Sequence, residues 1–507
     1  MFGDETTVAR GAASLYASSV VILLLNTGYF IVITNILTPS EIGVIAALNI
    51  IILFFGVVST VSLPQALVKF IPEFLGKGEP NKAKGSFKAS LVLVVGLSSA
   101  VAASLALTSG AAALALFKGE ALPIWITLAA LDLWLFSLSQ FFLATLIGLN
   151  QIPRASFFQT IGFALRSISG GSFVIFGQGI SGVLVGFIIG DALTLILSAS
   201  RSFRSLRGDA NEVPIKMLLG YSAPLLVAGL ISFGISQIDK VFTWLTRVAI
   251  SELGIYNIAV GASTIAASAP IAVTTALVPT LSSLDARQES LNFRNLSRVY
   301  TRYVSLIAMP VAFMIASLST SLIQIFGTAY YVGAFPLSIV SISVGITSVV
   351  AVYSGGLLAT KRTKPIMLAN IIGLVAFTAL LAVLVPAQGF LGAAWSRMAM
   401  NIVVAVVIIY FVRRSGLLVL DRKAFVGAMV ASVLAASLLY FSTNAIGGYR
   451  RQIAALPILI PSGVVVYLTV LRVLKIFNQD DVNFLKRLLP RRLEKLAIIA
   501  AKLAGVS

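Results

Sequence analysis

The chain contains no cysteine and no histidine, and it has few charged residues. Only 11% of its 507 residues are Asp, Glu, Lys or Arg. Without cysteine, disulfides and thiol chemistry are excluded, and without histidine the commonest metal ligand and proton carrier near neutral pH is missing. We therefore predict no metal site, and any bound proton or sodium ion must be held by carboxylates.

Apolar residues dominate the sequence instead. They make up 58% of it, the mean hydropathy is +1.00, and they form blocks of about twenty residues or more, enough to cross about 30 Å of hydrocarbon. A segment that crosses lipid must be helical, because its backbone groups find no partner outside it. We predict an all-α polytopic membrane protein with about fourteen transmembrane helices. The predicted spans are 12–37, 42–70, 87–109, 122–149, 155–177, 180–199, 217–245, 253–282, 300–326, 331–360, 366–385, 389–412, 425–444 and 452–471.

The net charge of +19 is concentrated in alternate loops. Lysine and arginine gather at 77–88, 201–207, 287–298, 361–364 and 413–423, whereas the loops at 38–41, 117–121, 177–179 and 386–388 are nearly bare. Cationic loops stay in the cytoplasm, so we expect both termini to be cytoplasmic and the protein to lie in the cell membrane. Because these loops account for the charge, no nucleic-acid partner is predicted.

The sequence repeats itself at an almost constant offset. Ser-Glu-Ile-Gly at 40–43 returns as Ser-Glu-Leu-Gly at 251–254, 211 positions later, and Gln-Thr-Ile-Gly at 159–162 returns as Asn-Ile-Ile-Gly at 370–373. Gly-Gln-Gly at 177–179 returns as Ala-Gln-Gly at 387–389, an offset of 210. Each copy holds six spans, an even number, so both copies enter the membrane from the same side. Two such bundles predict a central cavity suited to alternating access.

These repeats predict four parts of the chain. They are an N-terminal lobe at 1–209, a C-terminal lobe at 210–415, two additional helices at 416–472 and a cytoplasmic tail at 473–507. In the tail, leucines alternate with lysines and arginines at helical spacing. We expect this basic amphipathic segment to lie on anionic lipid.

Several motifs resemble a known family. They are Leu-Thr-Pro-Ser-Glu-Ile-Gly-Val at 37–44, Leu-Pro-Gln-Ala-Leu-Val-Lys-Phe-Ile-Pro-Glu at 63–73 and Gly-Phe-Leu-Gly-Ala-Ala at 389–394. Over about 12–414 the chain resembles the polysaccharide flippases of the multidrug/oligosaccharidyl-lipid/polysaccharide (MOP) exporter superfamily. The resemblance implies a flippase that moves a polyprenyl-phosphate- or diphosphate-linked oligosaccharide from the cytoplasmic to the outer leaflet. Its partners would be this substrate and membrane lipids, and we expect a monomer. A cation-coupled drug antiporter of the same superfamily, commonly with twelve spans, is the alternative.

Ionisable residues within spans are costly, so each one is a functional hypothesis. Arg166 lies in mid-span, where its guanidinium could bind phosphate or form a buried ion pair with Asp132. Arg397 is either a cavity cation or an anchor to headgroups. Lys69 could meet an incoming diphosphate or mark the cytoplasmic boundary. Asn26 could bind sugar hydroxyls or join two helices. We take Arg166, Arg397, Lys69 and Asn26 as the substrate-binding candidates.

Carboxylates are the only candidates for ion coupling. We predict Asp132 and Asp239 for this role, and Asp239 continues a helical stripe of serines at 232 and 236. Asp191 is interpreted as a structural hydrogen-bonding group, because the second repeat has Asn401 at its position. A cavity dominated by the two arginines would favour anionic glycolipids, whereas one dominated by the two aspartates would favour cations.

No motif of an enzyme is present. The sequence has neither Asp-x-Asp nor the glycine-rich Gly-Lys-Ser/Thr loop that binds ATP. The Asp-Asp doublet at 480–481 is better placed to cap a helix of the tail. No loop is long enough for a catalytic domain. We therefore expect no catalytic residues and no cofactor, apart from a coupling proton or sodium ion.

Overall fold

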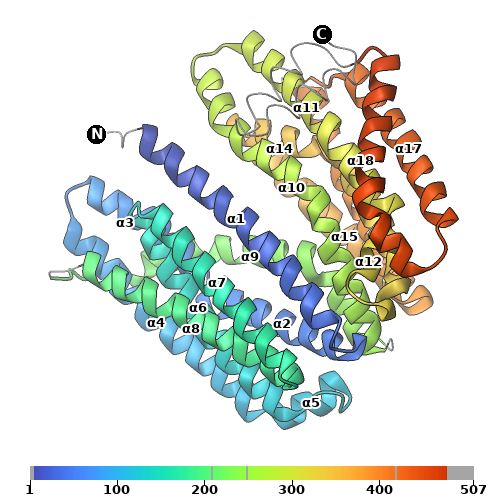
Figure 1. The fold of residues 1–507 in the computed structure, drawn as a ribbon. Helices are drawn as coiled ribbons and strands as arrows, with labels where there is room; N and C mark the ends of the chain where they lie inside the picture. Colours follow the sequence, from blue (N-terminus) through green and yellow to red (C-terminus); the bar gives the residue numbers. More distant parts are fainter. Residues whose placement is uncertain (1–4, 207–208, 247–248, 417–418, 477–507) are drawn as a thin grey trace. The chain divides into compact units, whose positions relative to one another are not determined.

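Every regular element that the structure describes is a helix (Figure 1). The computed structural model describes residues 5–206, 209–246, 249–416 and 419–476. Thirteen of its helices are long and apolar enough to cross a membrane. The prediction of an all-α polytopic membrane protein is thereby confirmed. The predicted tail, beyond residue 476, lies outside the described residues.

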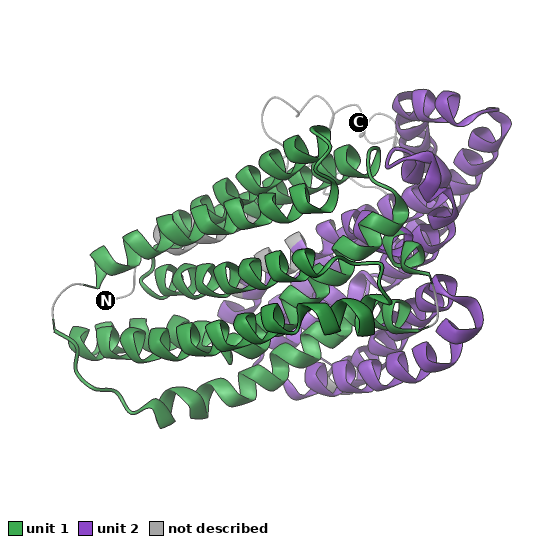
Figure 2. Cartoon of the chain, turned by 90° about the horizontal axis from the view of Figure 1, so that it is seen from below, with its two compact units in different colours: residues 1–254 green, residues 255–507 purple. Residues whose placement is uncertain are grey.

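Packing divides the chain into two compact units, Met1–Gly254 (unit 1) and Ile255–Ser507 (unit 2), coloured green and purple in Figure 2. Unit 1 contains α1 (Glu5–Thr34), α2 (Pro39–Thr60), α3 (Leu63–Gly76), α4 (Pro80–Leu107), α5 (Ser109–Phe117), α6 (Pro123–Gly148), α7 (Ile152–Ile175), α8 (Gly179–Ser205), α9 (Ile215–Leu245) and the start of α10 (Ile250–Ala286). Unit 2 contains the rest of α10, then α11 (Ser290–Ser317), α12 (Ser319–Gln324), η1 (Thr328–Gly333), α13 (Ala334–Thr347), α14 (Val349–Ala359), α15 (Lys364–Gln388), α16 (Phe390–Ser415), α17 (Arg422–Ala445) and α18 (Tyr449–Val473). The units reflect packing and the predicted lobes reflect the repeat, so the lobe boundaries stay a prediction.

The helices follow the predicted spans closely. Three spans are each broken into two helices: the span at 42–70 forms α2 and α3, the span at 300–326 forms α11 and α12, and the span at 331–360 forms α13 and α14. Helix α7 coincides with the span predicted at 155–177, but it is too polar to count among the thirteen most apolar helices. The most polar of the predicted spans is thus also the one that carries Arg166.

The first resemblance motif is a helix start. The Thr38 hydroxyl accepts a hydrogen bond from the Glu41 amide at 3.3 Å, and the Glu41 carboxylate accepts one from the Thr38 amide at 2.8 Å. Pro39 occupies the first turn, where its missing N–H costs nothing. Thr-Pro-Ser-Glu is therefore a capping box, which satisfies amides that lipid could not.

The helices repeat at the same offset as the sequence motifs. Helix α6 begins at Pro123 and α13 at Ala334, and α8 begins at Gly179 and α16 at Phe390, so both pairs are 211 positions apart. The break between α2 and α3 is not repeated. Val61 and Ser62 interrupt the chain between α2 and α3, whereas the equivalent residues of the second repeat lie within the continuous helix α10.

The Ser-Glu-Ile-Gly motif and its copy pack against each other in unit 1. A Cβ atom added to Gly43 would overlap the carbonyl oxygen of Ile250, and one added to Gly254 would overlap that of Pro39. Ile250 and Pro39 are themselves 211 positions apart, so the contact is reciprocal. Glycine is needed at both positions because the start of α2 and the start of α10 approach backbone to backbone.

The two additional helices belong to unit 2. One face of α17 is a row of buried alanines that packs against α11. Asp421 caps α17 by accepting from the Ala424 amide at 3.0 Å, and it also accepts from Arg302 of α11 at 3.4 Å. Arg302 donates in addition to the Ile476 carbonyl after α18. This network fastens both added helices to α11.

Candidate functional site

Helices α7 and α8 approach each other closely along a row of glycines. A Cβ atom on Gly190 would overlap Arg166, and one on Gly186 would overlap the backbone of Gly170. Small residues allow such close approach between helices in a membrane. The close approach leaves the side chain of Arg166 lying along α8.

Arg166 is paired with Asp191 on α8. Its Nη1 donates to the Asp191 Oδ2 at 3.3 Å, and its guanidinium carbon lies 3.4 Å from the ring centre of Phe187. The side chains of Arg166 and Asp191 are 19% and 13% exposed. The predicted alternative, an ion pair with Asp132, is wrong in its partner. Asp191, predicted to be a structural hydrogen-bonding group, is the paired carboxylate.

Asp132 is completely buried and neither of its carboxyl oxygens receives a hydrogen bond. It lies near the middle of α6, where its carboxyl faces that of Asp191. Two carboxylates offer only acceptors, so they can hydrogen-bond to each other only when one carries a proton. An unpaired buried carboxylate is costly. The arrangement can therefore hold one proton, or a cation between the two groups.

A tyrosine from α1 completes this group, which we call the charge cluster: Tyr29, Asp132, Arg166 and Asp191. The Tyr29 hydroxyl is buried without a hydrogen-bond partner and lies against Gly170, one turn beyond Arg166. Four helices thus bring together one cation, two carboxyls and one hydroxyl. The predicted residues Arg166 and Asp132 are close together, but through Asp191 as the link.

The second repeat replaces the two carboxyls with a neutral pair. Ser343 and Asn401 occupy the positions equivalent to Asp132 and Asp191. The Asn401 Nδ2 donates to the Ser343 Oγ at 2.9 Å. In unit 2 these two side chains are therefore hydrogen-bonded to each other, whereas Asp132 of unit 1 has no hydrogen-bond donor.

The arginine and its aromatic partner exchange positions between the repeats. Phe377 is equivalent to Arg166, and Arg397 is equivalent to Phe187. The Arg397 guanidinium carbon lies 5.6 Å from the ring centre of Phe377. Each unit thus has an arginine over an aromatic ring. The two arginines proposed for substrate binding stand at exchanged positions of this pair, because each lies where the other repeat has its aromatic residue.

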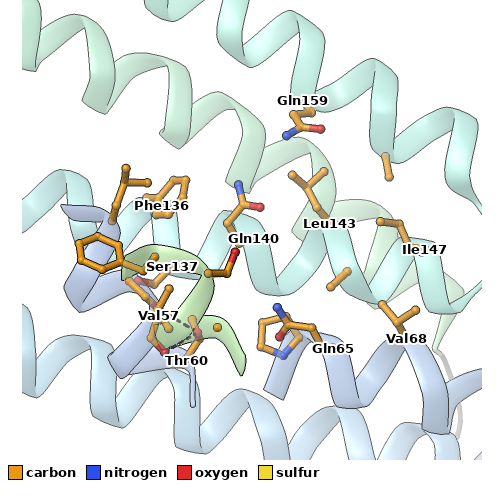
Figure 3. Close-up of a pocket in the computed structure, with 18 of the residues that line it drawn as sticks. Val57, Thr60, Gln65, Val68, Phe136, Ser137, Gln140, Leu143, Ile147 and Gln159 are labelled. Carbon is orange, nitrogen blue, oxygen red and sulfur yellow. Dashed lines mark hydrogen bonds between the residues drawn. The ribbon is translucent and has the colours of Figure 1, made fainter. Parts of the chain in front are cut away.

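Unit 1 also contains a cavity of about 630 Å³ between α1, α2, α3, α6, α7 and α9. Its polar lining consists only of amides and hydroxyls, and none of its described lining residues is charged. Figure 3 shows Gln65, Gln140 and Gln159 pointing into it. We call this cavity the amide pocket. Its polar lining residues are Thr60, Gln65, Ser137, Gln140, Ser156, Gln159, Ser232, Ser236 and Gln237.

A strained turn borders the amide pocket. Val61 and Ser62, between α2 and α3, have φ angles of 47° and 54°. A left-handed conformation is unfavourable for a β-branched residue such as Val61. Thr60, Pro64 and Gln65 flank this turn and line the pocket. The strain turns the chain so that α3 presents Gln65 to the cavity.

The other predicted residues lie apart from the lining of the pocket. Lys69 follows Gln65 by one helical turn, and its ammonium lies 4.2 Å from the ring centre of Tyr221 and 5.1 Å from that of Phe70. Asn26 is half-buried on α1, one turn before Tyr29. Asp239 is buried and accepts from the Lys240 amide at 2.9 Å.

Sequence reasoning missed the glutamines of the pocket. Four of the chain's eleven glutamines line it. The available signal was the presence of uncharged polar side chains within predicted spans, a weaker signal than charge. On α9 this signal was part of the prediction, because the two serines of the predicted stripe, Ser232 and Ser236, line the pocket.

Solved transporter structures share this fold. The lipid II flippase MurJ in an inward closed conformation has a TM-score of 0.72 at 14% identity, covering 90% of this chain and 97% of that chain. An inward-facing multidrug resistance MATE family transporter of the MOP superfamily has a TM-score of 0.67 at 13% identity, with 78% and 94% covered. A MOP superfamily transporter from Pyrococcus furiosus, described by the reverse polarity of its binding pocket, has a TM-score of 0.58 at 13% identity, with 82% and 96% covered. At such identities the likeness establishes the fold and leaves the substrate to the site.

The sequence itself places the chain in a family. A comparison with curated proteins finds no match. The family described as "Polysaccharide biosynthesis protein" matches residues 32–336, more than half of the chain. The match covers the amide pocket except Leu15, together with Asp132, Arg166 and Asp191 of the charge cluster. The chain is a multi-pass membrane protein that belongs to the polysaccharide biosynthesis protein family and has the fold of MOP superfamily transporters.

Proposed function

We propose that the chain is a flippase that moves a saccharide linked to a polyprenyl phosphate or diphosphate from the cytoplasmic to the outer leaflet. The family supports a role in polysaccharide synthesis, and the fold is that of transporters. The observation that carries the proposal is the amide pocket, because amides and hydroxyls suit the hydroxyl groups of a sugar. The chain is then a transporter without a chemical reaction of its own.

The same pocket argues against the cation antiporter. An antiporter of organic cations would need carboxylates in its cavity. Neither Asp132 nor Asp239 is among the lining residues. A pocket for organic cations would be expected to present a carboxylate or a cage of aromatic rings, and the described lining contains two aromatic residues, Phe136 and Phe233, and no acid.

Lys69 is the candidate contact for the phosphate groups. Gln65 and Val68, on the same helix, line the pocket, and Lys69 lies one turn from Gln65 with its side chain exposed. With both termini cytoplasmic, as the loops predict, Lys69 lies near the cytoplasmic end of its span. A sugar in the amide pocket would then place its phosphates beside the ammonium of Lys69.

Ion coupling belongs to the charge cluster in this proposal. Asp132 and Asp191 would hold a proton or a sodium ion, and its binding would change the pairing of Arg166. Arg166 itself, paired with Asp191, meets a phosphate only when that ion pair opens. Arg397, Asn26 and Asp239 remain predicted contributors to substrate binding and coupling.

The test is flipping in proteoliposomes. The purified chain is reconstituted with a labelled polyprenyl-diphosphate oligosaccharide, and the label's exposure to an impermeant outer reagent is followed under proton and sodium gradients. We expect exposure that depends on the protein, falls by about tenfold in Lys69→Ala and loses its dependence on the gradient in Asp132→Asn. Lys84→Ala, near the start of α4 and outside the pocket, is the matched control. Exposure no faster than in empty liposomes, together with gradient-driven efflux of an organic cation, would refute the flippase.

A further inference from the structure

We infer that the amide pocket binds uncharged sugar units and that the chain selects lipid-linked saccharides without acidic sugars. This inference rests on the proposed flippase function and deepens it by naming the class of sugar. It follows from the hydrogen-bonding groups of the pocket, from the charges that its lining lacks and from its apolar walls.

The four glutamine amides of the pocket are available to a ligand. Among the described residues, Gln65, Gln140, Gln159 and Gln237 make no side-chain hydrogen bond within the protein. Each amide offers one acceptor oxygen and an NH₂ group with two donors. A sugar hydroxyl is both donor and acceptor, so it can bond to either end of an amide. The three glutamines labelled in Figure 3 come from three helices, α3, α6 and α7, and point into one space.

A buried hydroxyl adds to this group. Ser156 lines the pocket, is 2% exposed, and its Oγ has no hydrogen-bond partner. A polar group withdrawn from water and left unpaired costs free energy. A pocket that collects such groups within a membrane segment is therefore suited to a polar ligand that can pair with them.

The pocket disfavours charged sugars because the part of its lining that the structure describes offers no cation to pair with them. Uronic acids and other acidic sugars need a cation for the carboxylate that they carry into the pocket. None of the described lining residues is charged, and the arginines of α7 have other partners: Arg154 donates to Gln151 at 3.0 Å and Arg166 donates to Asp191. Lys69 lies outside the lining and is assigned to the phosphate groups of the same substrate. An acidic sugar would thus bring an unpaired charge into the pocket, whereas a neutral sugar brings only hydroxyls.

The apolar part of the lining fits the carbon faces of sugar rings. Phe136 and Phe233 contribute aromatic rings, and Leu53, Val57 and Leu143 contribute aliphatic surface. A cavity of about 630 Å³, largely apolar with a few polar groups that fix orientation, is typical of small-molecule sites. The predicted topology places the ends of α6 and α7 that frame it toward the cytoplasm, where the substrate enters.

The experiment compares two labelled substrates on the same polyprenyl diphosphate, one ending in a neutral hexose and one ending in the corresponding hexuronic acid. Full-length protein in proteoliposomes is assayed for flipping of each. The double variant Gln140→Leu/Gln159→Leu removes two amides, and Gln159→Arg places a cation at an exposed position of the lining. Gln178→Leu, in the turn between α7 and α8, is the matched control. The melting temperature in detergent confirms that each variant is folded.

We expect wild type and Gln178→Leu to flip the neutral substrate at least about tenfold faster than the acidic one. The double variant should lose about tenfold or more on the neutral substrate, since each hydrogen bond is worth about two- to tenfold. Gln159→Arg should favour the acidic substrate. Equal rates on both substrates in wild type, or an unchanged rate in the folded double variant, would overturn the inference while leaving the flippase intact. Wild type that flips neither substrate would refute the proposed function itself.

Discussion

Removing Arg166 should destabilise unit 1 more than removing the whole ion pair. In Arg166→Leu, Asp191 and Asp132 are left facing each other without a cation, and Asp132 already lacks a donor. Breaking a buried pair by deleting one partner costs about 3–5 kcal/mol. The guanidinium also covers the ring of Phe187 at 3.4 Å, a contact worth up to about 2 kcal/mol when desolvated. Because both side chains keep some exposure, we expect a total loss near the lower end, about 3–4 kcal/mol.

The companion variants separate the charge effect from packing. Asp191→Asn alone leaves Arg166 without its partner, so we expect a loss of about 2–3 kcal/mol. The double variant Arg166→Leu/Asp191→Asn removes both charges and gives Asp132 an amide donor, like the Asn401 amide that serves Ser343 in unit 2. It should therefore be more stable than Arg166→Leu, with a coupling free energy of about 1–3 kcal/mol between the two sites.

The assay is equilibrium unfolding of the purified chain in mixed micelles, with the free energy of unfolding compared across the four members of the cycle. Phe203→Leu, on the same helix α8 but away from the cluster, serves as a control for packing changes. Losses of the two single variants that simply add in the double variant would show that Arg166 and Asp191 do not interact. That result would refute the charge cluster as described.

Three further predictions concern other parts of the chain. Gly43→Val should prevent the close approach of α2 to Ile250 and cost about 3 kcal/mol or more of unfolding free energy. Gly28→Ala, at a glycine with open space around it, should cost no more than about 1 kcal/mol in the same measurement. An equal loss in the two variants would contradict this prediction. Asp421→Ala should lower the free energy of unfolding by about 2–4 kcal/mol, because it removes the cap of α17 and the partner of Arg302. Asp421→Asn should lower it clearly less, because asparagine can still cap the helix. Equal losses in the two variants would show that the cap is unimportant. Asn401→Asp should destabilise unit 2 by about 1–3 kcal/mol, because a carboxylate cannot donate to Ser343, and an unchanged stability would weaken the comparison between the repeats.

The features set by hydrophobicity and by local sequence were predictable. Spans follow from the length of apolar blocks, and the duplication follows from motifs at a fixed offset, which the helices repeat to the residue at Pro123 and Ala334. The break between α2 and α3 has a local signal in Pro64, which lies in the first turn of α3 and is unfavourable inside a continuous helix. The left-handed conformation of Val61 and Ser62 was not predictable in this way, because neither residue is a glycine.

The partner of Arg166 shows what depth alone cannot decide. Counting residues from the ends of the spans places Asp132 and Asp191 both near mid-membrane, so either carboxylate could meet the arginine. The choice depends on which face each helix turns toward α7. That rotation is fixed by Gly186 and Gly190, which let α8 lie against the backbone of α7. A glycine pair four residues apart on α8, with Asp191 next to it, was the signal in the sequence that favoured Asp191.

The amide pocket was missed for a thermodynamic reason. A charged residue within a span is so costly that its presence in the sequence already indicates a special role, whereas a glutamine costs less and can also form ordinary contacts between helices. Only the structure distinguishes the two uses, because it shows the amides of Gln65, Gln140 and Gln159 without a partner in the protein and directed into one cavity (Figure 3). Charged residues within the spans therefore mark positions where the protein pairs its own groups, as in the charge cluster around Arg166. Neutral polar groups without a partner mark positions where a ligand can bind. In this chain the sugar-binding part of the substrate site is expected where charge is absent.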